Sequence, residues 1–220
     1  MYWLINSSIG RKLVMSLSGV FLILFLLFHA SMNMVLVFSA EAYDGICEFL
    51  GANWYAIVGT AILAGGLVVH IACATLLTLQ NQKARGTDKY GSANKTETEW
   101  AAKNMYVLGL IVLLGLAVHL LNFWYKMQLV ELLGHEPEQG SQLVIGLFSN
   151  YPVYTLVYLI WLAAIWFHLT HGVWSAFQTI GLNGATWFPR LKCISTIVAT
   201  LIMLMFAVVP IYFSIYALIF

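Results

Sequence analysis

The stretch that decides the fold is YPVYTLVYLIWLAAIWFHLTHGVWSAF at residues 151–177, an apolar run that contains His168 and His171. A membrane-spanning helix needs about 20 mainly apolar residues, each adding about 1.5 Å of rise. This run is long enough and is apolar around its whole circumference, so we expect a transmembrane helix. Four further runs meet the same test, and the five expected spans are residues 13–38, 54–79, 104–127, 151–177 and 194–219.

The composition also predicts an all-α membrane protein. The 220 residues are 61% hydrophobic and 9% charged, whereas a soluble domain has about 25% charged residues. Because the polar gaps are short, we expect one five-helix bundle over residues 1–220 and no separate soluble domain. The net charge of +1 does not suggest nucleic-acid binding. Cys47, Cys73 and Cys193 are too far apart for a metal-binding motif.

Lysine and arginine are distributed unevenly between the gaps. With the N-terminus in the cytoplasm, only Lys126 lies outside, and the inner side holds Arg11, Lys12, Lys83, Arg85, Lys89, Lys95, Lys103, Arg190 and Lys192. Such an excess is typical of cytoplasmic loops. We therefore expect a multi-pass protein of the cytoplasmic membrane, with its C-terminus outside. The first run is longer than the apolar core of about 7–15 residues in a secretory signal, so we interpret it as a mature helix.

Five of the six histidines lie inside the expected spans, where ionisable residues are rare and often functional. His29, His70, His119 and His168 each lie about 16 residues, or about 24 Å, into successive helices. Because neighbouring helices run in opposite directions, His29 and His119 should share one depth near the outer face. His70 and His168 should share another depth near the inner face.

Two pairs at two depths are typical of bis-histidine haem, in which one imidazole binds each side of the iron. A single histidine in a membrane is often only a hydrogen-bonding group between helices, but four at matched depths favour ligands. Zinc is less suitable, because no cysteine or acid completes either pair. His171 lies three residues after His168 on the same helix face and is an alternative to it. His135 lies in an acidic outer gap, where we expect it to be solvated.

The ordered set of motifs resembles the single-chain, five-helix, di-haem cytochrome b anchor of succinate dehydrogenases and quinol:fumarate reductases. The resemblance covers nearly the whole chain. It rests on RKL at 11–13 with SLSG at 16–19, on His29, on the lone His70 and His119, on HLTHGVWSAF at 168–177, and on PRLK at 189–192 before a fifth helix without a histidine.

The resemblance implies an inner haem b on His70 and His168 and an outer haem b on His29 and His119. The family's H-x-x-x-G pattern matches His168 and Gly172, which favours His168 over His171. The resemblance also implies a flavoprotein with FAD and an iron–sulfur protein on the cytoplasmic face, besides membrane lipid and a quinone, either menaquinone or ubiquinone. The chain has no flavin or iron–sulfur motif, so it is not expected to oxidise succinate alone.

One position departs from the family. Some fumarate reductases of this type have a glutamate two residues before the fourth-helix ligand, as part of a proton path. This chain has Trp166 there. We therefore do not expect a proton path through that position.

Further site residues are expected at the two membrane surfaces. For the haem propionates the inner candidates are Ser16, Trp100 and Lys103, with Arg11 and Lys12. Interface anchoring is an equally good role for these residues. For the quinone the preferred acid is Glu48, with Glu41 and Asp44 as alternatives. Each is also consistent with an ordinary solvated acid.

Two other functions are consistent with the sequence. The first is the di-haem cytochrome b subunit of a hydrogenase or formate dehydrogenase, which would have a different soluble partner. The second is a haem-free transporter that uses the histidines as a proton relay. Transporters often have broken helices, and Pro210 is the one proline we expect deep inside a span, which weakens this alternative.

Overall fold

Five long helices cross the molecule, as the hydropathy pattern predicts. The computed structural model describes residues 7–85, 100–182 and 184–219, and these contain no strand. The spanning helices are α2 (Ser8–Phe38), α4 (Trp54–Arg85), α6 (Met105–His119) continued by η1 (Leu120–Leu129) and α7 (Val130–Leu132), α9 (Pro152–Thr179) and α10 (Trp187–Ile219). All five are long and apolar enough to cross a membrane. The expected all-α, five-span fold is confirmed.

Three of these helices extend by five or more residues beyond the expected spans at the end of the bundle where α2 begins, and the third span continues at the other end through α7 to Leu132. α2 begins at Ser8, where Ser7 caps the helix by accepting a hydrogen bond from Gly10 N at 2.9 Å. α4 continues to Arg85, and α10 begins at Trp187 with Pro189 in its first turn, where proline is tolerated. Hydropathy marks only the part of a helix in the hydrocarbon layer, so these polar extensions were missed.

Short helices occupy much of the sequence between the spans. They are α3 (Ala40–Phe49), α5 (Trp100–Lys103) and α8 (Gly140–Asn150). Asp44 joins α3 to the start of α8. Its carboxylate accepts hydrogen bonds from Ser141 N at 2.7 Å, Ser141 Oγ at 2.6 Å and Gln139 Nε2 at 2.8 Å. The two helices therefore form one cover over that end of the bundle.

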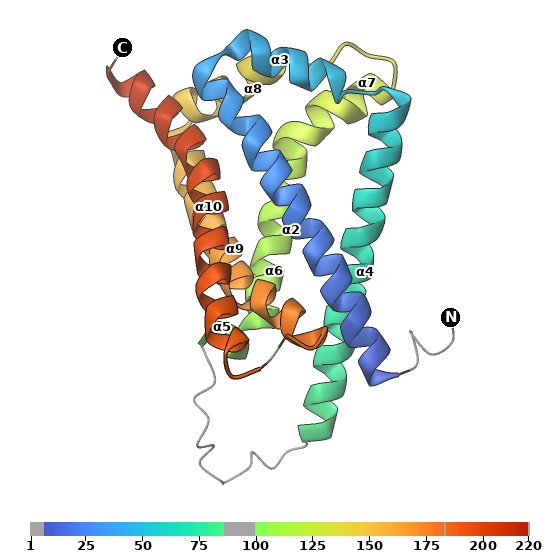
Figure 1. Ribbon diagram of the computed structural model, residues 1–220. Helices are drawn as coiled ribbons and strands as arrows, with labels where there is room; N and C mark the ends of the chain where they lie inside the picture. The colour runs from blue at the N-terminus through green and yellow to red at the C-terminus, as the bar shows by residue number, and fades with distance from the viewer. Residues whose placement is uncertain (1–6, 86–99, 183, 220) are drawn as a thin grey trace.

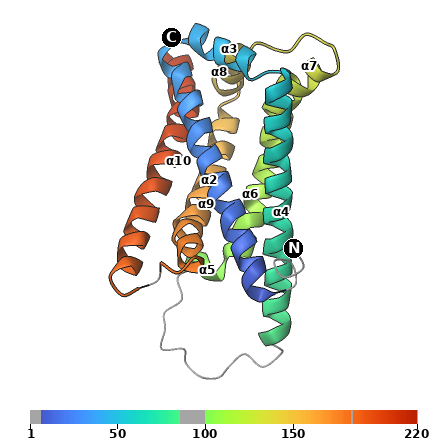
Figure 2. The same cartoon turned by 45° about the vertical axis from the view of Figure 1, so that its right-hand side comes forward.

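α4 and α10 lie on opposite sides of the bundle, and α2 crosses between them (Figures 1 and 2). α3, α7 and α8 lie at one end, whereas α5 lies at the other, beside the start of α10 (Figure 1). Because the number of spans is odd, α2 begins and α10 finishes at opposite ends. The six described acids all belong to the end with α3: Glu41, Asp44, Glu48, Glu131, Glu136 and Glu138. Lys89 and Lys95 lie outside the described residues.

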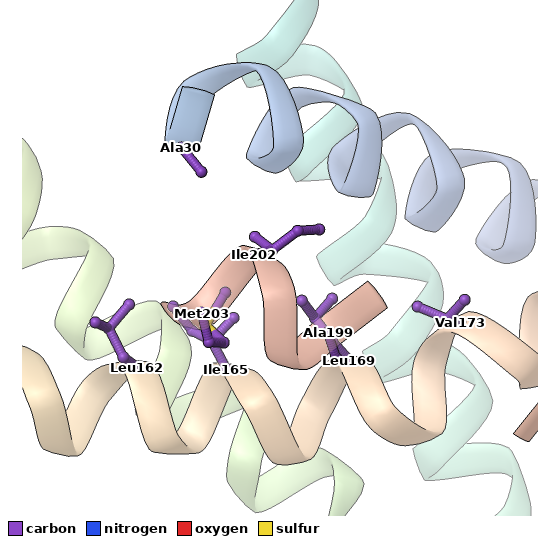
Figure 3. Close-up of a cluster of buried hydrophobic side chains, with 8 residues drawn as sticks. All are labelled: Ala30, Leu162, Ile165, Leu169, Val173, Ala199, Ile202 and Met203. Carbon is purple, nitrogen blue, oxygen red and sulfur yellow. The ribbon is translucent and has the colours of Figure 1, made fainter. Parts of the chain in front are cut away.

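The best-packed part of the bundle lies where α2, α9 and α10 meet. Figure 3 shows Leu162, Ile165 and Leu169 on one face of α9, close to Ala199 and Ile202 of α10. His168 immediately precedes Leu169, so its side chain leaves α9 about 100° away from this packed face. In contrast, none of the residues of α4 whose side chains are described is buried.

A π-helix, η1, begins directly after His119. Such wide turns are rare and are often found at functional sites. Here the π-helix contains Gln128, which is buried and links η1 to its neighbours. Its Oε1 accepts from Thr60 Oγ1 at 2.9 Å and from Trp124 Nε1 at 2.7 Å, and its Nε2 donates to the Gly51 carbonyl at 3.1 Å.

Candidate haem-binding histidine pairs

The inner histidines meet as one pair. His70 of α4 and His168 of α9 have ring centroids 6.4 Å apart, with the ring planes inclined at 62°. Glycines on two other helices lie against these rings. A Cβ atom at Gly19 of α2 would lie 3.5 Å from His70 Cε1, and one at Gly109 of α6 would lie 3.6 Å from His168 Cε1. Four helices therefore meet around the inner pair.

Ser18 lies within hydrogen-bonding distance of the His70 ring. The Ser18 hydroxyl donates to the Met15 carbonyl at 3.0 Å, and the same oxygen lies 3.2 Å from His70 Nδ1. With its hydroxyl hydrogen on the Met15 carbonyl, the Ser18 oxygen suits the His70 tautomer that carries its proton on Nδ1. The Nε2 lone pair of His70 is then available to a metal, in the arrangement that ligating histidines usually adopt.

The outer histidines also meet as a pair. His29 of α2 and His119 of α6 have ring centroids 5.8 Å apart, with the ring planes inclined at 83°. Aromatic rings surround them: Phe25 stacks on His29 at 5.4 Å, and Trp161 of α9 lies 5.6 Å from His119. The Trp161 indole is held by a 3.0 Å hydrogen bond to the Val112 carbonyl.

The two pairs lie at different depths. Gly19 lies beside the inner pair and His29 belongs to the outer pair, ten residues further along α2. Gly109 and His119 have the same spacing along α6. Ten residues of helix rise about 15 Å, so both helices give the same separation between the two layers.

The dimensions of both pairs fit a shared metal with two axial imidazoles. A metal–imidazole bond is about 2 Å long and the ring centre lies about 1 Å behind the nitrogen, so two trans imidazoles have centres about 6 Å apart. No group of three or more His, Cys, Asp or Glu suited to a metal ion occurs among the described residues. Two imidazoles are enough for haem, because the macrocycle supplies the other four nitrogens.

Within the described residues, neither His119 nor His168 joins helices through Nδ1. A histidine that only joins helices would hydrogen-bond to a neighbouring helix. Nδ1 is buried in both residues and has no hydrogen-bond partner within residues 7–85, 100–182 and 184–219. In His29, Nδ1 has a 3.4 Å contact with Asn33 Nδ2, which is longer than an ordinary hydrogen bond.

The remaining candidates lie apart from one another. The His171 ring packs on Trp174 at 4.7 Å, whereas His168 is the one that meets His70. Ser16 is buried and donates to the Lys12 carbonyl at 2.9 Å. The other residues singled out in the sequence lie at both ends of the bundle. Lys12, Lys103 and Trp100 are exposed at the α5 end, and Glu41, Glu48 and His135 are exposed at the α3 end.

Several contacts of the site were not found from the sequence. The bond from Ser18 to His70 and the contact of Trp161 with His119 depend on which way each helix faces its neighbours. Asp44, a quinone candidate in the sequence, uses its carboxylate to join α3 and α8.

Comparisons with protein-family models, with curated proteins and with solved structures each find no match for this chain.

Proposed function

We propose that this chain is the di-haem cytochrome b anchor of a succinate:quinone oxidoreductase, either a succinate dehydrogenase or a fumarate reductase. The observation that carries the proposal is the meeting of four histidines from four helices as two pairs, with centroid separations of 6.4 and 5.8 Å. The family resemblance supplies the choice of complex, and the same pairs would serve another di-haem cytochrome b with a different soluble partner.

Each pair has a defined task in this proposal. His70 and His168 hold the inner haem, and His29 and His119 hold the outer one. Bound haem supplies one-electron transfer, so two of them about 15 Å apart make a path through the apolar layer. Ser18 keeps the Nδ1 proton on His70, and the aromatic rings around His119 exclude water from the outer layer.

The basic end of the bundle is the proposed cytoplasmic side, where the iron–sulfur and flavoprotein subunits would dock. The acidic end then faces outward. Quinone chemistry exchanges protons together with electrons, and the exposed carboxylate of Glu48 in α3 is the proposed proton-exchanging group there. The membrane is the cytoplasmic membrane in this proposal.

Single histidine variants test the assignment of the pairs. We expect His70→Ala to remove the absorbance of one haem and leave the other, because the outer ligands lie about 15 Å away. His29→Ala should remove the complementary signal. His135→Ala, in the exposed outer loop, is the matched control and should retain both. Retention of two haems by His70→Ala, or loss of the same signal in both ligand variants, would contradict the pairing.

The attached soluble subunits distinguish the related complexes. Purification of this chain from membranes under mild detergent should bring down a protein with FAD and an iron–sulfur protein. If a hydrogenase or formate dehydrogenase subunit co-purified instead, the di-haem assignment would stand, but the proposed complex would be wrong.

A further inference from the structure

α4 carries His70 of the inner pair and lies at the edge of the bundle (Figures 1 and 2). None of its described side chains is buried. Apolar contacts alone give such a helix little preference for one depth, because lipid tails are as apolar as leucine side chains. We therefore expect directional polar contacts to set the depth of α4. The contact of Ser18 with His70 is one of them, and further ones lie where α4 begins.

A buried glutamine supplies contacts at the start of α4. Gln128 of η1 is 8% exposed, and its Oε1 accepts a hydrogen bond from Thr60 Oγ1 of α4 at 2.9 Å. Its Nε2 donates to the carbonyl of Gly51, just before α4, at 3.1 Å. Trp124 Nε1 donates to the same Oε1 at 2.7 Å and so holds the glutamine side chain in place. Gln128 thus joins the third span to α4 at two points.

The next turn of the third span reinforces this connection. The carboxylate of Glu131 in α7 accepts a hydrogen bond from Ala52 N at 2.9 Å. A Cβ atom at Gly51 would lie 2.6 Å from Glu131 Oε2, so the two segments approach as closely as glycine allows. Both views show α7 beside the start of α4 (Figures 1 and 2). The end of the third span is therefore fastened to the first turn of α4.

The third span is in turn fixed to α9, the helix that carries His168. Trp161 of α9 donates to the Val112 carbonyl of α6 at 3.0 Å. Leu108 of α6 and Ala164 of α9 belong to one small buried cluster. The helix of one inner histidine therefore holds the third span, and the third span holds the helix of the other.

α4 can carry a displacement from its start to the inner pair. Thr60 and His70 are ten residues apart on one continuous helix, a rise of about 15 Å. Movement of Thr60 along the helix axis therefore moves His70 by the same amount.

We propose that Gln128 is a positioning residue for the inner pair: by fixing the depth of α4, it aligns His70 with His168. The inference rests on the proposed haem function, because a metal shared by two imidazoles requires this alignment. It assigns Gln128 to the more distant pair, although His119 of the outer pair is only nine residues before it in the same span.

Electron paramagnetic resonance and redox titration of the oxidised complex test the assignment, because both depend on how the two imidazoles are oriented at the iron. His70→Ala identifies the inner signal by its loss. In Thr60→Val and in Gln128→Leu we expect a shifted inner signal and about a threefold change in the redox equilibrium of the inner haem, with the outer haem unchanged. Thr60→Ser keeps the hydroxyl and should restore both properties.

Asn122→Leu is the matched control, because Asn122 is in the same π-helix and donates to Tyr158 Oη of α9 at 3.2 Å. The Tyr158 ring lies 6.2 Å from His119, so any change should appear in the outer haem. An unchanged inner haem in Gln128→Leu, a shift of the outer haem alone, or equal inner shifts in Gln128→Leu and Asn122→Leu would overturn the proposal.

Spin labels test the position of α4 without haem. Lys83→Cys and Gln178→Cys, in a chain whose three native cysteines are replaced by alanine, place labels at exposed positions near the ends of α4 and α9. The distribution of distances between the labels should broaden in Gln128→Leu and stay unchanged in Asn122→Leu. An unchanged distribution in Gln128→Leu would overturn the positioning role, whereas a chain that binds no haem would overturn the proposed function.

Discussion

At the scale of single residues, the contact of Ser18 with His70 favours the tautomer that leaves Nε2 available to a metal. The Ser18 oxygen lies 3.2 Å from Nδ1, and with its own hydrogen on the Met15 carbonyl it can accept from that nitrogen. His168, the other member of the pair, has no such partner for Nδ1 among the described residues. The two ligands of the proposed inner haem therefore differ in basicity.

Ser18→Ala should raise the midpoint potential of the inner haem. Loss of the acceptor makes the imidazole a weaker donor to the iron, which favours the reduced state. We expect a shift on the order of tens of millivolts, since a tenfold change in the redox equilibrium is about 59 mV for one electron. A redox titration followed by optical absorbance measures it.

Ser31→Ala is the control for this titration, because Ser31 is on the same helix and its hydroxyl donates to the Leu27 carbonyl at 2.8 Å. Both haem potentials should stay unchanged in it. An equal shift in the two serine variants, or a shift of the outer haem alone in Ser18→Ala, would disprove the role of Ser18.

Gly115 of α6 has no room for a side chain beside the outer pair. A Cβ atom there would collide with the Trp161 indole, which contacts His119 and donates to the Val112 carbonyl. Gly115→Ala should therefore displace Trp161, lower stability by about 1–3 kcal/mol as overpacking does, and reduce the outer haem signal. Thermal unfolding and haem content measure the two effects.

Gly59→Ala is the matched comparison, since no atom lies within 4 Å of a Cβ at that position. Alanine is also the better helix former, so this variant should be as stable as the original chain or slightly more stable. If Gly115→Ala behaved like Gly59→Ala, the contact between α6 and Trp161 would be looser than described.

At the scale of the elements, α3 and α8 pack closely around the half-buried thiol of Cys47. A Cβ at Gly140 would lie 2.6 Å from Cys47 Sγ, so glycine is required where α8 begins. Burial raises the pKa of the Cys47 thiol to about 11, because the thiolate is the form that loses solvation. Burial likewise raises the pKa of the neighbouring Tyr43 hydroxyl.

Cys47 should consequently resist alkylation under mildly alkaline conditions. The thiolate is the reactive form, and with a pKa of about 11 only about one molecule in a hundred is ionised at pH 9. Its labelling by iodoacetamide should rise steeply only as the pH approaches 11. Peptide mapping by mass spectrometry after labelling at several pH values measures this.

Cys193 is exposed and serves as the internal reference for accessibility in detergent. Unfolding in dodecyl sulfate should bring the labelling of Cys47 up to that of Cys193. Equal labelling of both cysteines at pH 9 in the folded protein would mean that α3 and α8 separate.

At the scale of the whole molecule, the number of spans and the pairing of the histidines could be predicted from residue counts. Apolar length sets which helices cross, and an equal distance of His29 and His119 along parallel helices sets their shared depth. Counting cannot say which way a helix faces, so the contact of Ser18 with His70 and that of Gly115 with Trp161 required the structure. The helices α3 and α8 between the spans were not predicted, because they are too short to register as spans.

The helices of the bundle are not equally well packed. α2, α9 and α10 meet through a buried apolar cluster (Figure 3), and α4 contributes no buried residue among those with described side chains. In the proposed complex, haem makes up part of the contact between α4 and its neighbours. Removal of haem should therefore loosen α4 before it loosens the cluster.

The count of haem groups per chain tests the central claim most directly. A dithionite-reduced minus oxidised spectrum of the purified complex, with haem quantified against protein, should give two b-type haems per chain. A value of one would mean that one of the two histidine pairs does not bind haem. A value of zero would contradict the electron-transfer function and leave the four histidines in need of another explanation.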